Sequence, residues 1–150
     1  MSELRELYQT TILDHNKQPR NFRVPAGANR QAAGHNPLCG DRVVVHVVFE
    51  DDVVKDVGFQ GAGCAISTAS ASLMTQAVKG MSRAEFEKLF DAFHEVVTGD
   101  PQRAVDAASV GKLAVLAGVR EYPVRVKCAT LAWHTLRAAL AGGRETVKTE

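Results

Sequence analysis

Hydrophobic residues follow two different spacings along the chain, and each spacing predicts a different element. From Leu4 to Ile12 they recur at helical spacing, which predicts an amphipathic helix from about Ser2 to His15. Residues 18–38 then mix proline, glycine and asparagine with polar side chains, a composition typical of loops. The first helix is therefore expected to lead through a long connection into the next segment.

A strand-like pattern of apolar residues begins a few residues after this connection. Every second residue from Val43 to Phe49 is apolar, which predicts a strand with one face toward a core and the other half exposed to water. Asp51 and Asp52 mark a turn, and the sequence VVKDVGFQG after them predicts a second strand paired antiparallel with the first. A hairpin is expected, and it leads into the glycine-rich sequence GAGC.

Helical patterns return in the second half of the chain. A closely packed helix is predicted from Cys64 to a left-handed stop at Gly80. Ser82 and Glu85 form a capping box before a helix that ends at Gly99. Two short helical pieces interrupted by a glycine are expected between residues 100 and 119, beginning at an Asp-Pro start.

The last predicted helix follows Pro123 and stops before a pair of glycines at 142 and 143, after which residues 143–150 are expected to form a flexible tail. These elements indicate an α+β fold within one domain of residues 1–150, in which a small antiparallel sheet packs against helices.

Overall charge argues against two classes of partner. Eighteen basic residues against seventeen acidic ones give a net charge of +1, so neither nucleic acid nor an anionic membrane is expected as the main partner. The first twenty residues mix both charge signs and do not resemble a signal peptide, and no apolar run is long enough to cross a bilayer. We expect a cytoplasmic protein whose three cysteines are free thiols or metal ligands.

The three cysteines occupy the junctions between predicted elements. Cys39 lies in the loop before the first strand, Cys64 between a glycine turn and a helix, and Cys128 in the first turn of the last helix. One interpretation makes each a small buried hydrophobic residue. The other uses the positive end of a helix, which favours thiolate and lowers the pKa of Cys64 and Cys128.

A carboxylate accompanies the first cysteine in the sequence NPLCGD, because Asp41 follows Cys39 with only Gly40 between them. Three thiolates and one carboxylate make a four-ligand set that zinc accepts, and the hard carboxylate is expected to keep the site exchangeable. Arg125 precedes Cys128 by three residues, so it is either a solvated surface residue or a cation that stabilises a thiolate or holds Asp41.

His35 and Lys127 flank these motifs in the sequence. His35 is the histidine nearest the cysteine loop, and it is either solvated or functional. Lys127 adjoins Cys128 but points in another helical direction. Neither residue is assigned a role by the pattern alone.

Three motifs, NPLCGD, GAGCAIS and YPVRVKCATLAW, together resemble the IscU/SufU (NifU N-terminal-like) family of iron–sulfur cluster assembly proteins over nearly the whole chain. The resemblance is to the SufU branch, since Lys127 stands where IscU-type proteins have a histidine and an LPPVK-type chaperone motif is missing. Residues 99–118 match the insertion of about twenty residues that SufU-type proteins carry before the third cysteine. The resemblance to this family implies a sheet of about three strands packed against about five helices.

The resemblance also implies a function. Cys39 would accept persulfide sulfur from a SufS-like cysteine desulfurase for the downstream iron–sulfur assembly machinery, which would make the protein a zinc-dependent sulfurtransferase, and Arg125 would assist at this site. The zinc ligands would be Cys39, Asp41, Cys64 and Cys128. One alternative is a scaffold that holds iron or a [2Fe–2S] cluster on the same ligands, against which Lys127 argues; another is a zinc-stabilised interaction module.

Overall fold

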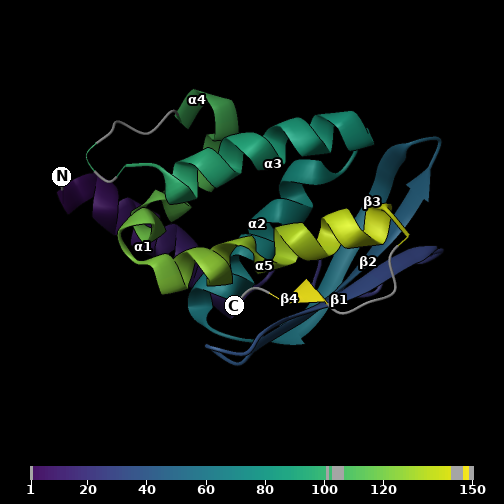
Figure 1. Ribbon diagram of the computed structural model, residues 1–150, viewed down its shortest axis with the longest axis horizontal. Coiled ribbons are helices and arrows are strands. Elements are labelled where there is room, and N and C mark those ends of the chain that lie inside the picture. Colours follow the sequence, from purple (N-terminus) through teal and green to yellow (C-terminus); the bar gives the residue numbers. More distant parts are fainter. Residues whose placement is uncertain (1, 101, 103–106, 143–146, 149–150) are drawn as a thin grey trace.

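A computed structural model describes residues 2–100, 102, 107–142 and 147–148, and Figure 1 shows the arrangement of its elements. In chain order the elements are α1 (Ser2–Lys17), β1 (Arg30–Asn36), β2 (Asp41–Glu50), β3 (Val53–Ala62), α2 (Ala65–Val78), α3 (Arg83–Thr98), α4 (Ala107–Val110), the 3₁₀ helix η1 (Gly111–Glu121), α5 (Pro123–Leu140) and β4 (Val147–Lys148). The expected α+β class is confirmed.

The sheet has the strand order β3-β2-β1-β4. Its first three strands are antiparallel, as expected, and β4 adds two residues parallel to β1. The predicted hairpin is confirmed: Asp51 and Asp52 both have positive φ, 52° and 63°, which is the backbone that a tight two-residue turn between twisted strands requires. Val147 and Lys148, which we expected to lie in a flexible tail, thus pair with the sheet.

Strand β1 corrects the expectation of a loop over residues 18–38. Its sequence, RQAAGHN, has little intrinsic preference for a strand, so its structure depends on pairing with β2 and on packing against α5. A Cβ atom at Gly34 would collide with the side chains of Thr135 and Leu131, so glycine there lets β1 and α5 approach closely. Tertiary packing, rather than local propensity, makes this segment a strand.

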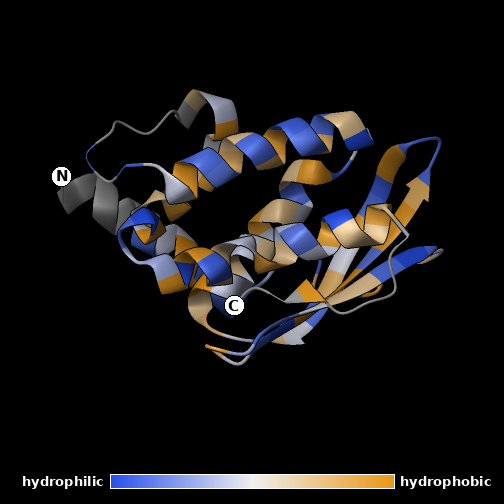
Figure 2. Ribbon diagram, in the orientation of Figure 1, coloured by the Kyte–Doolittle hydropathy of each residue, from blue (hydrophilic) through white to orange (hydrophobic). Residues whose placement is uncertain are grey.

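One face of the sheet is covered by helices, with α5 over β1 and β2 and α2 against β3 (Figure 1). The core between these layers centres on Trp133 of α5, whose ring stacks on Phe93 at 4.6 Å and Phe86 at 6.1 Å between ring centroids. Both phenylalanines belong to α3, along which polar and apolar residues alternate in Figure 2. The capping box of Ser82 and Glu85 at its start and the end at Gly99 are confirmed.

Two helical pieces follow α3, as predicted, and they meet at Gly111, which has φ of 58°. The second piece is a 3₁₀ helix rather than an α-helix. The predicted Asp-Pro start falls on residue 101, outside the described residues. Within the described part of the chain, no helix is both long and apolar enough to cross a membrane.

Candidate metal centre

Cys39 and Asp41 lie at the turn that joins β1 to β2. Asn36 pairs with Asp41 across the two strands, so residues 37–40 form the connecting loop. Gly40 has φ of 72°, a backbone conformation that glycine adopts without steric cost. Cys39 is half-buried in this loop, whereas Asp41 is 0% exposed at the start of β2.

Asp41 reaches from β2 to the start of α2. Its Oδ1 accepts a hydrogen bond from the backbone N–H of Cys64 at 2.8 Å, and its Oδ2 lies 3.9 Å from the Cys64 sulfur. A Cβ atom at Gly63 would stand only 2.6 Å from Asp41 Oδ1. The glycine turn before Cys64 therefore leaves room for the carboxylate.

Cys64 caps the N-terminus of α2. Its sulfur accepts a hydrogen bond from the backbone N–H of Ser67 at 3.4 Å, in the position that a serine or aspartate oxygen usually takes. The predicted placement of this cysteine at a helix N-terminus is confirmed.

Cys128 differs from its expected position and chemistry. Because α5 begins at Pro123, Cys128 lies in the second turn, and it is 0% exposed. Burial raises the pKa of its thiol, and hydrogen bonds with Asp41 and Cys39 raise it further. The predicted lowering of the Cys128 pKa is wrong, because desolvation of the sulfur outweighs a helix end that lies a turn away.

The potential ligand atoms of Cys39, Asp41 and Cys128 all lie within 4.8 Å of one another. The sulfur atoms of Cys39 and Cys128 are 3.4 Å apart, which is too far for a disulfide. It is close to the distance of about 3.5–3.8 Å that separates two ligand atoms in a tetrahedral zinc site with these ligands. Cys64 is not among these three residues, but its sulfur lies 3.9 Å from Asp41 Oδ2. Three thiols around a buried carboxylate fit a small soft or borderline cation such as zinc.

Arg125 lies at the exposed entrance to the cysteine group. Negative charge on the neighbouring cysteines raises the pKa of its guanidinium, with Cys64 the largest contribution and Cys128 the next. Among the described residues, no ion pair joins Arg125 to Asp41. Its side chain is exposed, so a role in stabilising a thiolate stays a prediction beside the alternative of a solvated surface residue.

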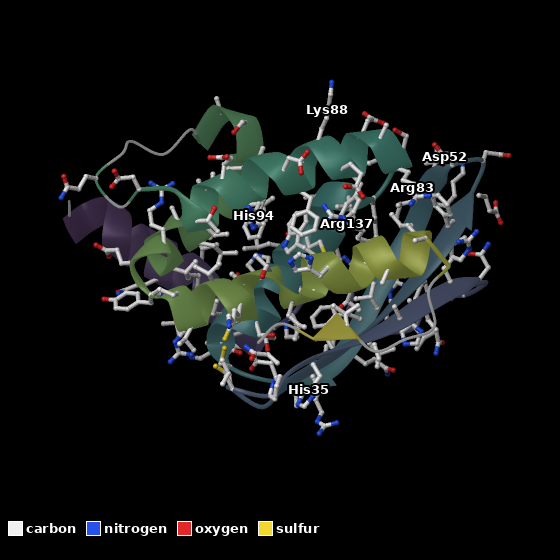
Figure 3. The ribbon with its side chains drawn as sticks, viewed as in Figure 1. His35, Asp52, Arg83, Lys88, His94 and Arg137 are labelled. Carbon is white, nitrogen blue, oxygen red and sulfur yellow. The ribbon has the colours of Figure 1, made fainter. Side chains whose placement is uncertain are left out.

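His35 and Lys127 do not join the three ligand atoms that converge. Side chains of β1 alternate in burial, with Ala32, Gly34 and Asn36 turned inward. His35 lies on the other face, turned away from the helices (Figure 3). Lys127 is half-buried beside Cys128 on α5.

Asn36 is a site residue that sequence reasoning missed. It is 0% exposed, and its Nδ2 lies 3.6 Å from the Cys128 sulfur. The Asn-Pro pair that opens NPLCGD signals a turn at this residue, but it does not indicate that the side chain reaches Cys128.

Three exposed apolar side chains adjoin the centre, and these we call the apolar rim. Leu38 precedes Cys39 and is 61% exposed, while Tyr122 and Val124 lie at the start of α5 with 61% and 50% exposure. Exposed apolar residues grouped on one part of a surface are typical of a region that meets another protein.

Comparison with known proteins places this arrangement among relatives. The sequence profile described as NifU-like N terminal domain matches residues 7–129. The chain is 41% identical to the iron-sulfur cluster assembly scaffold protein IscU of Streptococcus pyogenes serotype M1, over 93% of this chain and 86% of the relative. It is 38% identical to the zinc-dependent sulfurtransferase SufU of Bacillus subtilis, over 93% of each chain.

A solved structure shares the fold as well. It is that of a putative iron-sulfur cluster assembly scaffold protein for the SUF system from Fervidobacterium islandicum AW-1, with a TM-score of 0.78 and 32% identity, over 87% of this chain and 93% of that one.

Proposed function

Since the chain belongs to the NifU-like N-terminal domain family of IscU/SufU iron–sulfur cluster assembly proteins, we propose that it is a zinc-dependent sulfurtransferase that accepts sulfur on Cys39. One observation carries the proposal: three thiols surround a buried carboxylate, and one thiol, that of Cys39, is on a loop. Cys64 caps one helix and Cys128 is buried in another, so they are suited to hold the metal while Cys39 reacts.

Zinc would be held by Cys39, Asp41, Cys64 and Cys128, and when bound it would keep the thiols deprotonated while reducing their nucleophilicity. A carboxylate binds a borderline metal less tightly than a thiolate does, so this shell is more exchangeable than one of four cysteines. Exchange matters because Cys39 must present a free sulfur lone pair to react.

The proposed step is a thiol–persulfide exchange. The thiolate of Cys39 attacks the outer sulfur of a persulfide on the partner protein, forming a new S–S bond on Cys39. The S–S bond of the partner breaks, and its cysteine leaves as a thiolate, so the exchange involves no net oxidation or reduction. Arg125, whose pKa is raised by negative charge on the nearby cysteines, would stabilise the negative charge during this step.

The proposed sulfur donor is a cysteine desulfurase, and the acceptor that follows belongs to the iron–sulfur assembly machinery. The apolar rim of Leu38, Tyr122 and Val124 offers the donor a contact surface beside Cys39. Three free thiols persist in a reducing compartment, so we place the exchange in the cytoplasm.

Mass spectrometry tests the proposal directly. The zinc-loaded protein is incubated with a purified cysteine desulfurase and cysteine, and intact and peptide masses then locate the added sulfur. We expect sulfur on the peptide containing Cys39, and none when cysteine is left out. Equal sulfur loading of the Cys39→Ala protein would overturn the assignment.

A cluster scaffold is the second candidate, favoured by the name of the Streptococcus pyogenes relative at 41% identity. The same four ligands would then hold a [2Fe–2S] cluster as cargo to be passed on. Protein purified without oxygen distinguishes the two functions: a colourless, zinc-containing protein supports sulfur transfer, and a brown, iron-containing protein supports the scaffold.

A further inference from the structure

Asn36 connects the cysteine loop to the buried helix that carries Cys128. It is the last residue of β1 and faces inward, in line with Ala32 and Gly34, so its side chain points toward α5. Both ends of its amide are used. Nδ2 lies 3.6 Å from the Cys128 sulfur, within hydrogen-bonding range for sulfur, and Oδ1 accepts the backbone N–H of Leu38 at 3.2 Å.

The contact with Leu38 shapes the loop. An asparagine oxygen that accepts the N–H two residues later forms a local turn independent of the strands. Asn36 also pairs with Asp41 across the hairpin, so it fixes both the start and the closure of residues 37–40. Cys39 lies within this short loop, with its sulfur 3.4 Å from that of Cys128.

The contact with Cys128 serves the ligand itself. Cys128 is 0% exposed, so water cannot stabilise negative charge on its sulfur. An N–H donor beside the sulfur stabilises that charge instead. Asparagine supplies this donor without carrying charge, so it does not compete with a cation for the ligands. Replacing a residue that hydrogen-bonds to a metal ligand commonly lowers metal affinity 10- to 100-fold.

We infer that Asn36 is a positioning residue, which uses one amide to hold Cys39 against Cys128 and to supply a hydrogen bond to the Cys128 sulfur. The inference deepens the proposed function, because the loop that it shapes carries the proposed sulfur acceptor. It concerns the geometry of the ligands, and it therefore has consequences that do not depend on sulfur transfer.

Two substitutions keep the contact with Leu38 and remove the one with Cys128. Asn36→Asp keeps an oxygen for the Leu38 N–H and places a second oxygen, in place of the donor, beside the Cys128 sulfur. Asn36→Ser provides a hydroxyl that can accept the Leu38 N–H but is too short to reach Cys128. Asn29→Asp is the matched control, because Asn29 also uses both ends of its amide, on Phe49, in a segment without cysteines.

The test replaces zinc with Co²⁺, whose sulfur-to-metal absorption bands report on the thiolates. We expect shifted bands and roughly 10- to 100-fold weaker Co²⁺ binding for both Asn36 variants, while the Asn29→Asp protein behaves as wild type. A folded Asn36→Ser protein with wild-type bands and affinity would overturn the inference. So would an equal loss of affinity in the Asn29→Asp protein.

Sulfur loading of the same proteins separates this inference from the proposed function. If wild-type Cys39 takes up no sulfur, the proposed function fails, while the Co²⁺ result still decides the role of Asn36. If wild type is loaded and both Asn36 variants load at the wild-type rate with unchanged Co²⁺ bands, the positioning role fails and the proposed function stands.

Discussion

Asp41 has an unusual environment for a carboxylate. It is wholly enclosed by protein, and one of its oxygens is taken by the Cys64 N–H while the other faces sulfur atoms. A buried carboxylate is costly unless it is paired or binds a metal, and none of the ion pairs of the described residues includes Asp41. A cation among the cysteines would satisfy this charge, which makes Asp41 the residue that most directly links the fold to a metal.

Asp41→Asn tests this link. The amide oxygen still accepts the Cys64 N–H, so the fold is preserved, but the negative charge is lost from the ligand set. We expect zinc affinity to fall by at least about tenfold, since one of four anionic ligands becomes a weak neutral one. Competition with a chromophoric chelator measures the affinity, and Asp56→Asn on β3 is a matched control outside the centre. Unchanged affinity in the Asp41→Asn protein would refute the role of this carboxylate.

The start of α2 shows how one element depends on another. The backbone N–H of Cys64, the N-cap residue of this helix, donates a hydrogen bond to the side chain of Asp41 in β2. Asp41 can come this close only because residue 63 is a glycine. The geometry of the centre is therefore built into the joint between β3 and α2.

Gly63→Ala should disturb that joint. Its Cβ would lie 2.6 Å from Asp41 Oδ1, so the carboxylate or the turn must move, at a cost of about 1–3 kcal/mol in the free energy of unfolding and with weaker metal binding. Gly118→Ala, with no atom near its added Cβ, should have little effect. Urea unfolding of both variants makes the comparison, and equal stability would contradict the close contact.

The contact between α1 and α2 predicts a pH dependence. His15 is 5% exposed, and its Nδ1 lies 2.7 Å from Ser72 Oγ on α2. Burial lowers the pKa of His15, and the charge of Arg20 lowers it further. The unfolded chain therefore binds a proton first as the pH falls, so the stabilising contribution is complete above about pH 6.5 and is lost below it.

His15→Gln removes this titration. We expect the urea midpoint of the wild-type protein to fall more steeply than that of the variant as the pH decreases below about 6.5. His35→Gln, on the outer face of the sheet, is the control for replacing a histidine outside the contact between α1 and α2. Identical slopes for wild type and His15→Gln would rule out His15 as the cause.

The elements with strong patterns were predictable, and those held in place by tertiary contacts were not. The alternation of β2, the capping box of α3 and the Pro123 start of α5 all correspond to the structure. Strand β1 was not predicted because its small residues are explained by the close approach of α5 at Gly34. The residue that Gly34 accommodates, Thr135, lies 101 residues later in the chain. The four ligand candidates were found from residue type, whereas the burial of Cys128 and the amide of Asn36 depend on packing.

At the scale of the whole molecule, the centre and the apolar rim share one end of the fold. The loop after β1 carries Cys39 and Leu38, and the start of α5 carries Tyr122, Val124 and Arg125. A partner that covers the rim therefore also covers the entrance to the thiols, so binding and sulfur transfer are expected to depend on the same surface.

Val124→Ser tests this dependence without touching a proposed ligand. We expect it to weaken binding of the desulfurase by about 5- to 30-fold, as the loss of one to two kcal/mol of apolar contact implies. Val24→Ser is the matched control, because Val24 is also 50% exposed but lies in the segment before β1. Titration calorimetry with the purified desulfurase measures both, and equal affinities would exclude the rim from the interface.

The close approach of β1 and α5 at Gly34 and Thr135 has a consequence for how the protein is made. The ligand candidates come from residues 39, 41, 64 and 128, so the centre is complete only after the last long helix has docked on the first strand. A nascent or misassembled chain has separate thiols but no centre. If the protein has the proposed function, metal binding would therefore select completely folded molecules for sulfur transfer.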